Sequence, residues 1–187
     1  NRTASKAQEL AEEAGATAVG TPREVAEACS TVITMVTDSP DVEAVVLGEG
    51  GAIEGIQRDA VLIDMSTISP SVTRTIAGRL KEKGAHMLDA PVSGGSWGAI
   101  EGTLSIMVGG DKAVFDRCMP VFEAMGRNIV LTGPNGAGQT TKLVNQILVV
   151  GTMNAVAEAN KAAMFVTLAV SHNDKSLLNW SVIPSLF

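Results

Sequence analysis

Short β-branched apolar runs that alternate with helix-forming segments constrain the fold of this chain most. Residues 31–37 (TVITMVT) and 60–65 (AVLIDM) are continuous apolar runs, as in strands buried on both faces of a sheet. Further strands are predicted at residues 16–19, 86–89, 102–108 and 129–131. The alternation predicts an α/β fold in which helices cover a parallel or mostly parallel sheet.

Helix boundaries follow from residues that begin or end helices. Helices are predicted over residues 5–14, from Pro22 onward, and over residues 39–47, 70–83 and 111–125. Thr21 and Ser39 each precede a proline and are expected to cap the helices that follow, and Ser69 with Pro70 is expected to start the next helix. Ligands of such sheets bind beyond the carboxyl ends of the strands, so the residues that follow each strand are the candidates for a site.

Composition narrows the range of partners. The 187 residues carry a formal net charge of −6 and no block of lysines and arginines, which argues against nucleic acid. Cys29 and Cys118 are far apart and lack metal-ligand spacing, so we expect free thiols in a reducing compartment, a cytoplasmic location and no metal. No apolar run is long enough to cross a bilayer, and a small molecule is the expected ligand.

Lys142 follows a glycine-rich turn at residues 132–136 and lies near the start of a long apolar-periodic stretch. Asn145 is three residues further on, so both side chains are expected on one face of a helix. A lysine held there with an amide beside it could donate a proton. A lysine that extends its charge to water from the rim of a core helix fits the same spacing.

Two of the predicted strand ends could meet a dinucleotide. If a strand ended just before Asn1, Arg2 and Thr3, these residues would lie where an arginine accommodates a 2′-phosphate. The alternative is a helix start with an unrelated arginine. Ser66 and Thr67 place two hydroxyls after residues 60–65, although they also fit a simple turn before the next helix.

A third strand end offers backbone amides. Ser93, Gly94 and Gly95 follow Pro91, which stiffens the exit from the strand at residues 86–89. The serine hydroxyl and the glycine amides could hold an anion such as a carboxylate. The alternative is a flexible Ser-Gly-Gly loop.

Four motifs in the same order resemble the β-hydroxyacid dehydrogenase family. They are IDMSTISP (63–70), LDAPVSGG (88–95), GTLSIMVGGDKAVFD (102–116) and GAGQTTKLVNQ (136–146), and the resemblance covers about residues 1–159. That family includes 3-hydroxyisobutyrate dehydrogenase and 2-hydroxy-3-oxopropionate (tartronate semialdehyde) reductase, and residues 46–56 and 104–113 are most similar to the reductase. The resemblance implies an NAD(P)-dependent oxidoreductase with a Rossmann domain, a long helix and an all-helical domain that forms dimers.

The resemblance also implies roles for individual residues. Lys142 resembles the catalytic lysine, and Asn145 a second substrate contact. Ser93, Gly94 and Gly95 resemble the loop that binds the substrate carboxylate. The implied cofactor contacts are Asn1, Arg2, Thr3, Met35, Val36 and Thr67. The first three resemble the NADP-type ending of the second strand, which favours NADP over NAD.

The chain departs from the family pattern at both ends. It starts downstream of the first strand and its glycine-rich turn, and residues 160–187 do not resemble the helical domain. We therefore expect a fragment: a partial Rossmann-type doubly wound sheet at residues 1–133, then an interdomain helix and a truncated or divergent segment at 134–187. A 6-phosphogluconate dehydrogenase would carry histidine where Val144 stands. A truncated, non-catalytic protein that acts through interactions is the remaining alternative.

Overall fold

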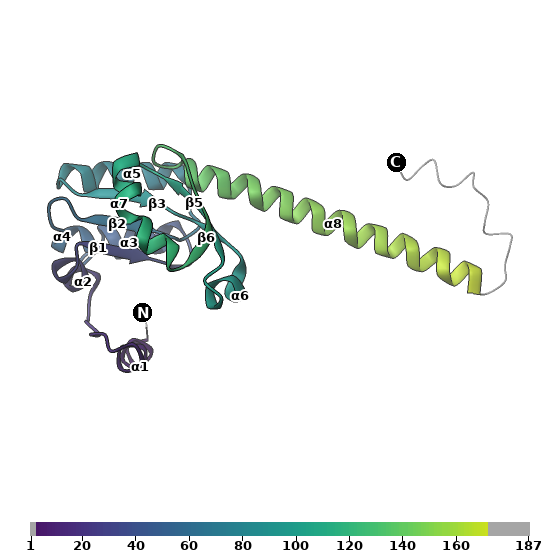
Figure 1. Ribbon diagram of the computed structural model, residues 1–187, viewed down its shortest axis with the longest axis horizontal. Helices are drawn as coiled ribbons and strands as arrows, with labels where there is room; N and C mark the ends of the chain where they lie inside the picture. The colour runs from purple at the N-terminus through teal and green to yellow at the C-terminus, as the bar shows by residue number, and fades with distance from the viewer. Residues whose placement is uncertain (1–2, 172–187) are drawn as a thin grey trace. The chain divides into compact units, whose positions relative to one another are not determined.

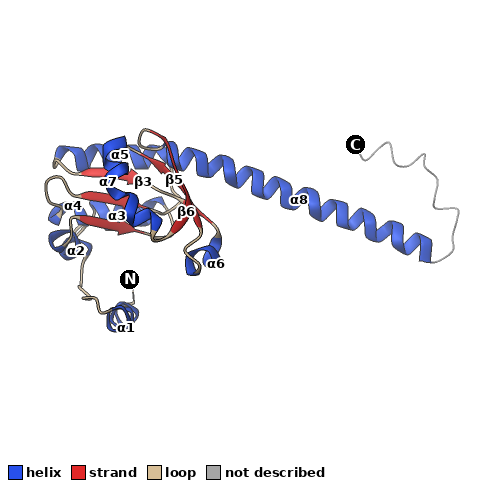
Figure 2. Cartoon of the chain, viewed as in Figure 1, coloured by secondary structure: helices blue, strands red, loops and turns tan. Residues whose placement is uncertain are grey.

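The computed structural model describes residues 3–171, with side chains through residue 164. This part of the chain separates into two compact units after Leu143. The first unit contains one sheet and its covering helices, and Figure 2 shows the strands side by side in a single layer. The long helix α8 (Ala137–Ser171) begins in the first unit and supplies the described part of the second.

Six strands form the sheet in the order β1-β2-β3-β5-β4, with β6 paired to β5. They are β1 (Thr31–Thr34), β2 (Val61–Asp64), β3 (His86–Asp89), β4 (Val92–Ser93), β5 (Leu104–Gly109) and β6 (Gly126–Gly133). The pairs β1·β2, β2·β3 and β5·β6 are parallel, whereas β5 is antiparallel to β3 and β4. The expected α/β sheet is therefore present, and it is mixed.

The first unit also contains seven complete helices among the described residues (Figure 1). They are α1 (Ala4–Ala14), α2 (Pro22–Ala28), α3 (Ser39–Leu47), α4 (Ala52–Gly55), α5 (Pro70–Glu82), α6 (Gly95–Ile100) and α7 (Lys112–Glu123). The cap predicted at Thr21 is confirmed, since its hydroxyl accepts from the Glu24 amide. The helix start predicted at Ser69 and Pro70 is confirmed as well, and the Ser69 hydroxyl accepts from the Ser71 amide. Asp38 caps α3 in place of Ser39, because its carboxylate accepts from the Ser39 amide and makes Ser39 the first helical residue.

Two expectations about strands were wrong, and one alternative for a loop is excluded. Residues 16–19 form no strand: all four are exposed and pair with no described strand. The run at 31–37 is a strand only over β1, which ends the sheet order and leaves Ile33 44% exposed, so it is not buried on both faces. Residues 93–95 are not a flexible loop, because β4 and α6 include Ser93 and Gly95.

Two hydrophobic cores lie on opposite faces of the sheet. One combines the side chains of α2, α3, α4 and α5 with Leu62 of β2 and Met87 of β3. The other combines α7 with Ile63 and Leu88, the next residues along the same two strands. Successive side chains of a strand point to opposite faces, so β2 and β3 are covered on both sides. This double burial confirms the prediction for residues 60–65, and β2 is buried throughout.

The start of α8 lies unusually close to the sheet. A Cβ at Gly138 would lie 2.7 Å from the backbone oxygen of Asp89 and would clash with that of Met107. A Cβ at Gly109, on β5, would lie 2.8 Å from the Gly138 nitrogen. The two glycines therefore allow the first turn of α8 to contact the ends of β3 and β5 directly.

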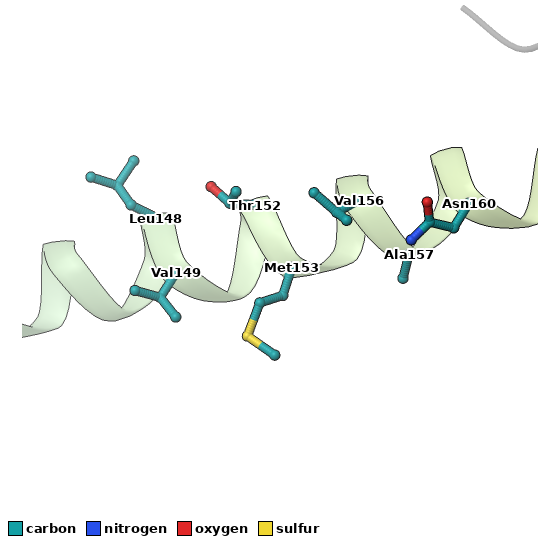
Figure 3. A pocket seen from close by; sticks show the side chains of 7 residues that line it. All are labelled: Leu148, Val149, Thr152, Met153, Val156, Ala157 and Asn160. Atoms are coloured by element: carbon teal, nitrogen blue, oxygen red, sulfur yellow. The ribbon is translucent and has the colours of Figure 1, made fainter. Parts of the chain in front are cut away.

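In the second unit, α8 exposes apolar side chains in rows with a spacing of four residues. Leu148, Thr152 and Val156 project from one side of the helix, and Val149 and Met153 from another (Figure 3). For the segment at residues 160–187 we expect apolar residues such as Phe165, Leu168 and Trp180 to remain partly exposed, and these three side chains lie outside the described ones.

We predict that Gly138→Ala lowers the free energy of unfolding by about 1–3 kcal/mol, because the added methyl must displace backbone that cannot move freely. Urea denaturation of the chain measures this loss. Gly78→Ala is the matched control. Gly78 lies within α5 with open space around its Cβ position, so alanine there should stabilise by about 0.5–1 kcal/mol. Equal effects of the two substitutions would contradict the close approach at Gly138.

Candidate functional site

The carboxyl ends of β1, β2 and β3 bring polar residues into register. Thr34 of β1 pairs with Asp64 of β2, and Asp64 pairs with Asp89 of β3. The Thr34 hydroxyl donates to Asp64 Oδ1 at 2.8 Å, and the Ser66 amide donates to the same oxygen at 3.2 Å. The Val36 amide donates to Ser66 Oγ at 2.9 Å. These bonds join the loop after β1 to the loop after β2.

Asp64 is a structural group at this edge. It is fully buried, and its Oδ2 has no hydrogen-bond partner among the described residues. Burial raises the pKa of the Asp64 carboxyl, and nearby Asp89 raises it slightly further; the hydrogen bonds from Ser66 and Thr34 act in the opposite direction. The carboxyl thus has a greater preference for its neutral form than an exposed aspartate has.

The residues expected to contact a cofactor stand on these joined loops. Met35 is 64% exposed and Val36 is half-buried. Thr67 is exposed between the buried residues Ser66 and Ile68. The structure therefore brings the two predicted loops together and leaves Met35 and Thr67 accessible to a ligand.

Asp89 connects β3 to the start of α8. Its fully buried carboxylate accepts from the Gly136 amide at 2.8 Å and from the Gln139 amide at 3.1 Å. Carboxylates stabilise helix N-termini because the first amides of a helix have no partner within it. Sequence analysis missed this function of Asp89, because the two amides lie 47 and 50 residues further along the chain.

Gln139 is a second residue that sequence analysis missed. Its side chain is fully buried, donates to the Ser66 backbone oxygen at 2.7 Å and accepts from the Ile68 amide at 3.0 Å. A polar residue three positions before Lys142 on a buried helix face was the available signal. These contacts fasten the loop around Thr67 to α8.

Lys142 lies on the buried side of α8, on the same face as Gln139. It is only 8% exposed and makes no salt bridge within the described part of the chain. Burial lowers the pKa of its ammonium group. Most of the Lys142 surface is therefore shielded from solvent, and the lowered pKa shifts its amine in the direction that favours proton transfer.

The predicted anion loop is ordered by its neighbours. Ser93 pairs with Ser105 of β5, and Gly94 and Gly95 have φ angles of +135° and +62°. A Cβ at Gly94 would lie 3.1 Å from Leu104 Cδ2, so glycine suits both the conformation and the space. No hydrogen bond among the described residues joins this loop to Lys142.

The remaining predicted site residues are less constrained. Asn1 and Arg2 lie outside the described residues, and Thr3 precedes α1 in an extended conformation. Asn145 follows the boundary between the two units, and its amide is 3.4 Å from Gln146 Oε1. Residues 3–171 contain no cluster of three or more side chains suited to a metal ion. None of the helices there has both the length and the apolar character needed to span a membrane.

Comparisons with known proteins show which family this chain resembles. Residues 1–133 match the family described as the NAD binding domain of 6-phosphogluconate dehydrogenase. The chain is 52% identical over 145 residues to 2-hydroxy-3-oxopropionate reductase of Escherichia coli, covering 78% of the chain and 50% of that protein. It is 43% identical over 148 residues to NAD-dependent L-serine dehydrogenase of Pseudomonas aeruginosa, covering 77% and 50%.

A solved structure shows the same fold. Mycobacterium tuberculosis 3-hydroxyisobutyrate dehydrogenase with L-serine superposes with a TM-score of 0.76 at 34% identity, over 83% of this chain and 53% of that one. The chain thus spans about half the length of the relatives it matches. The matched domain, the shared fold and these identities together show that the chain belongs to the β-hydroxyacid dehydrogenase family.

Proposed function

We propose that the protein carrying this chain is an NAD(P)-dependent oxidoreductase that interconverts a β-hydroxyacid and its semialdehyde, with 2-hydroxy-3-oxopropionate as the substrate. The observation that carries the proposal is Lys142, a buried lysine of lowered pKa whose helix is tied to the loops at the carboxyl edge of the sheet. The 52% identity to the Escherichia coli reductase supports the choice of substrate.

The loops at the carboxyl ends of β1 and β2 suit the binding of a pyridine nucleotide. Met35 and Thr67 are exposed on two loops that the hydrogen bond from the Val36 amide to Ser66 joins. Arg2 would face the 2′-phosphate of NADP, as in dinucleotide folds that carry arginine at the end of the second strand. A bound nicotinamide would supply the hydride.

Lys142 would act as the proton donor for the reduction. As the substrate carbonyl oxygen gains negative charge, the Lys142 ammonium stabilises it and transfers a proton to it. In the oxidation, the neutral amine removes that proton from the hydroxyl. Ser93 and the amides of Gly94 and Gly95 hold the substrate carboxylate, and Asn145 orients the hydroxyl.

A second candidate reaction is the oxidation of 3-hydroxyisobutyrate. It is favoured by the similarity to the Mycobacterium tuberculosis enzyme, whose structure contains L-serine. Each compound combines a carboxylate with an oxygen on the β-carbon, an aldehyde in 2-hydroxy-3-oxopropionate and a hydroxyl in 3-hydroxyisobutyrate, so the same loop and lysine would serve either substrate. The kcat/KM of the complete protein with each substrate decides between them.

We predict that Lys142→Ala, in the complete protein, lowers kcat at least about a hundredfold and leaves NADPH affinity nearly unchanged, because its proton is needed only as the alkoxide forms. Lys142→Arg should also lower kcat strongly, since guanidinium retains its proton near neutral pH. Steady-state kinetics and cofactor titration measure both effects. Lys161→Ala is the control, because Lys161 lies on the same helix with its side chain 64% exposed. Full turnover in Lys142→Ala would refute the assignment.

We predict opposite pH dependences for the two directions. Since burial lowers the pKa of Lys142, its ammonium loses its proton at a lower pH than an exposed lysine does. Reduction needs the ammonium, so its kcat/KM should fall as pH rises through that pKa. Oxidation needs the neutral amine, so its kcat/KM should rise over the same interval. If the residual kcat/KM of Lys142→Ala still fell with pH in the reduction and rose with pH in the oxidation, a group other than Lys142 would cause both pH dependences.

We predict that the complete protein prefers NADPH to NADH. Arg2→Ala should lower kcat/KM for NADPH about ten- to a hundredfold, the range for losing a hydrogen bond to a charged group, and should change that for NADH little. Kinetics with both cofactors tests this. A wild-type preference for NADH, the cofactor type named for the Pseudomonas aeruginosa relative, would remove the role given to Arg2.

A further inference from the structure

Gln139 makes two hydrogen bonds that enclose Thr67. Its Nε2 donates to the backbone oxygen of Ser66 at 2.7 Å, and its Oε1 accepts from the backbone amide of Ile68 at 3.0 Å. The Gln139 side chain is fully buried, and Ser66 and Ile68 are buried as well. One amide group therefore satisfies two backbone groups that lie on either side of an exposed residue.

The same turn of α8 is held by the sheet. The Gln139 backbone amide donates to Asp89 Oδ2 at 3.1 Å, and the Gly136 amide donates to Asp89 Oδ1 at 2.8 Å. Gln139 is thus fixed through its backbone to β3 and through its side chain to the loop after β2. Lys142 is three residues further along, so it lies on the same helix face.

We infer that Gln139 is a positioning residue, which holds the Thr67 loop and Lys142 in a fixed relative placement by bonding that loop to the helix turn preceding the lysine. The inference rests on the proposed function, in which Thr67 contacts the cofactor and Lys142 the reacting oxygen. Gln139 would then touch neither the substrate nor the cofactor, yet it would fix the relative positions of the groups that guide hydride transfer and proton transfer. A misplacement of about 1 Å at such a site can reduce a rate a hundredfold.

The chemistry of the contact makes the role testable. Leucine has a volume close to that of glutamine but leaves the Ser66 oxygen and the Ile68 amide without their partner. An ionised glutamate can accept from Ile68 but cannot donate to Ser66. Protonation of that glutamate would restore the missing donor, and burial favours the protonated form.

The experiment compares Gln139→Leu, Gln139→Glu and Ile76→Ala with wild type in the complete protein. Ile76 is fully buried in the same core cluster as Ile68, so its truncation lowers stability by removing apolar packing while every hydrogen-bonding group around Gln139 stays present. We expect Gln139→Leu to lower kcat about ten- to a hundredfold. Ile76→Ala should keep its kcat at a temperature where it remains folded. The activity of Gln139→Glu relative to wild type should recover as pH falls.

Hydrogen exchange at the Ile68 amide separates this inference from the proposed function, because it requires no turnover. In Gln139→Leu, exchange of the Ile68 amide should accelerate by more than the loss of global stability explains. In Ile76→Ala, exchange of the same amide should change by no more than the loss of global stability explains. Unchanged exchange, or a kcat in both Gln139 variants equal to that of Ile76→Ala, would overturn the positioning role. Absence of turnover in wild type, with exchange accelerated as expected, would instead overturn the proposed function while retaining the contact.

Discussion

The carboxylate of Asp89 is the contact on which the site geometry depends. It ends a buried strand and accepts from two amides at the start of α8, which would otherwise lack partners. Gly109 and Gly138 allow the helix to approach closely enough for these bonds to form. Through this contact, the position of β3 in the sheet determines where the first turns of α8 begin and, therefore, where Lys142 lies.

Two aspartates in register at the same edge have different surroundings. Asp89 receives two backbone amides from a helix N-terminus, an environment that favours negative charge. Asp64, its partner across β2 and β3, is buried with one oxygen unpaired, and its pKa is raised. Asp64 acts at this edge through its bonds to Thr34 and Ser66, whereas Asp89 acts through its bonds to the start of α8.

Local sequence information predicted those parts of the fold that depend on local interactions. The cap at Thr21, the helix start at Ser69 and the doubly buried strand β2 follow from side chains within a few residues of one another. The failures share a different cause. Among the described strands, residues 16–19 have no neighbour despite their strand-like character, and β1 has a single neighbour that leaves Ile33 exposed. Whether an apolar run becomes a buried strand depends on partners that its own residues do not specify.

The same distinction applies to the candidate site. Helical spacing placed Lys142 and Asn145 on one face of α8, but it could not distinguish a buried lysine from one that extends its charge to water. The hydrogen bonds that fasten the start of α8 to the sheet and its loops span 47 to 73 residues and are made by Asp89 and Gln139. A buried ammonium without a salt bridge in the described chain reduces stability, since burial disfavours its charge. Such a cost is reasonable where a developing negative charge offsets it during reaction, which is why the burial of Lys142 supports a catalytic role more strongly than its spacing does.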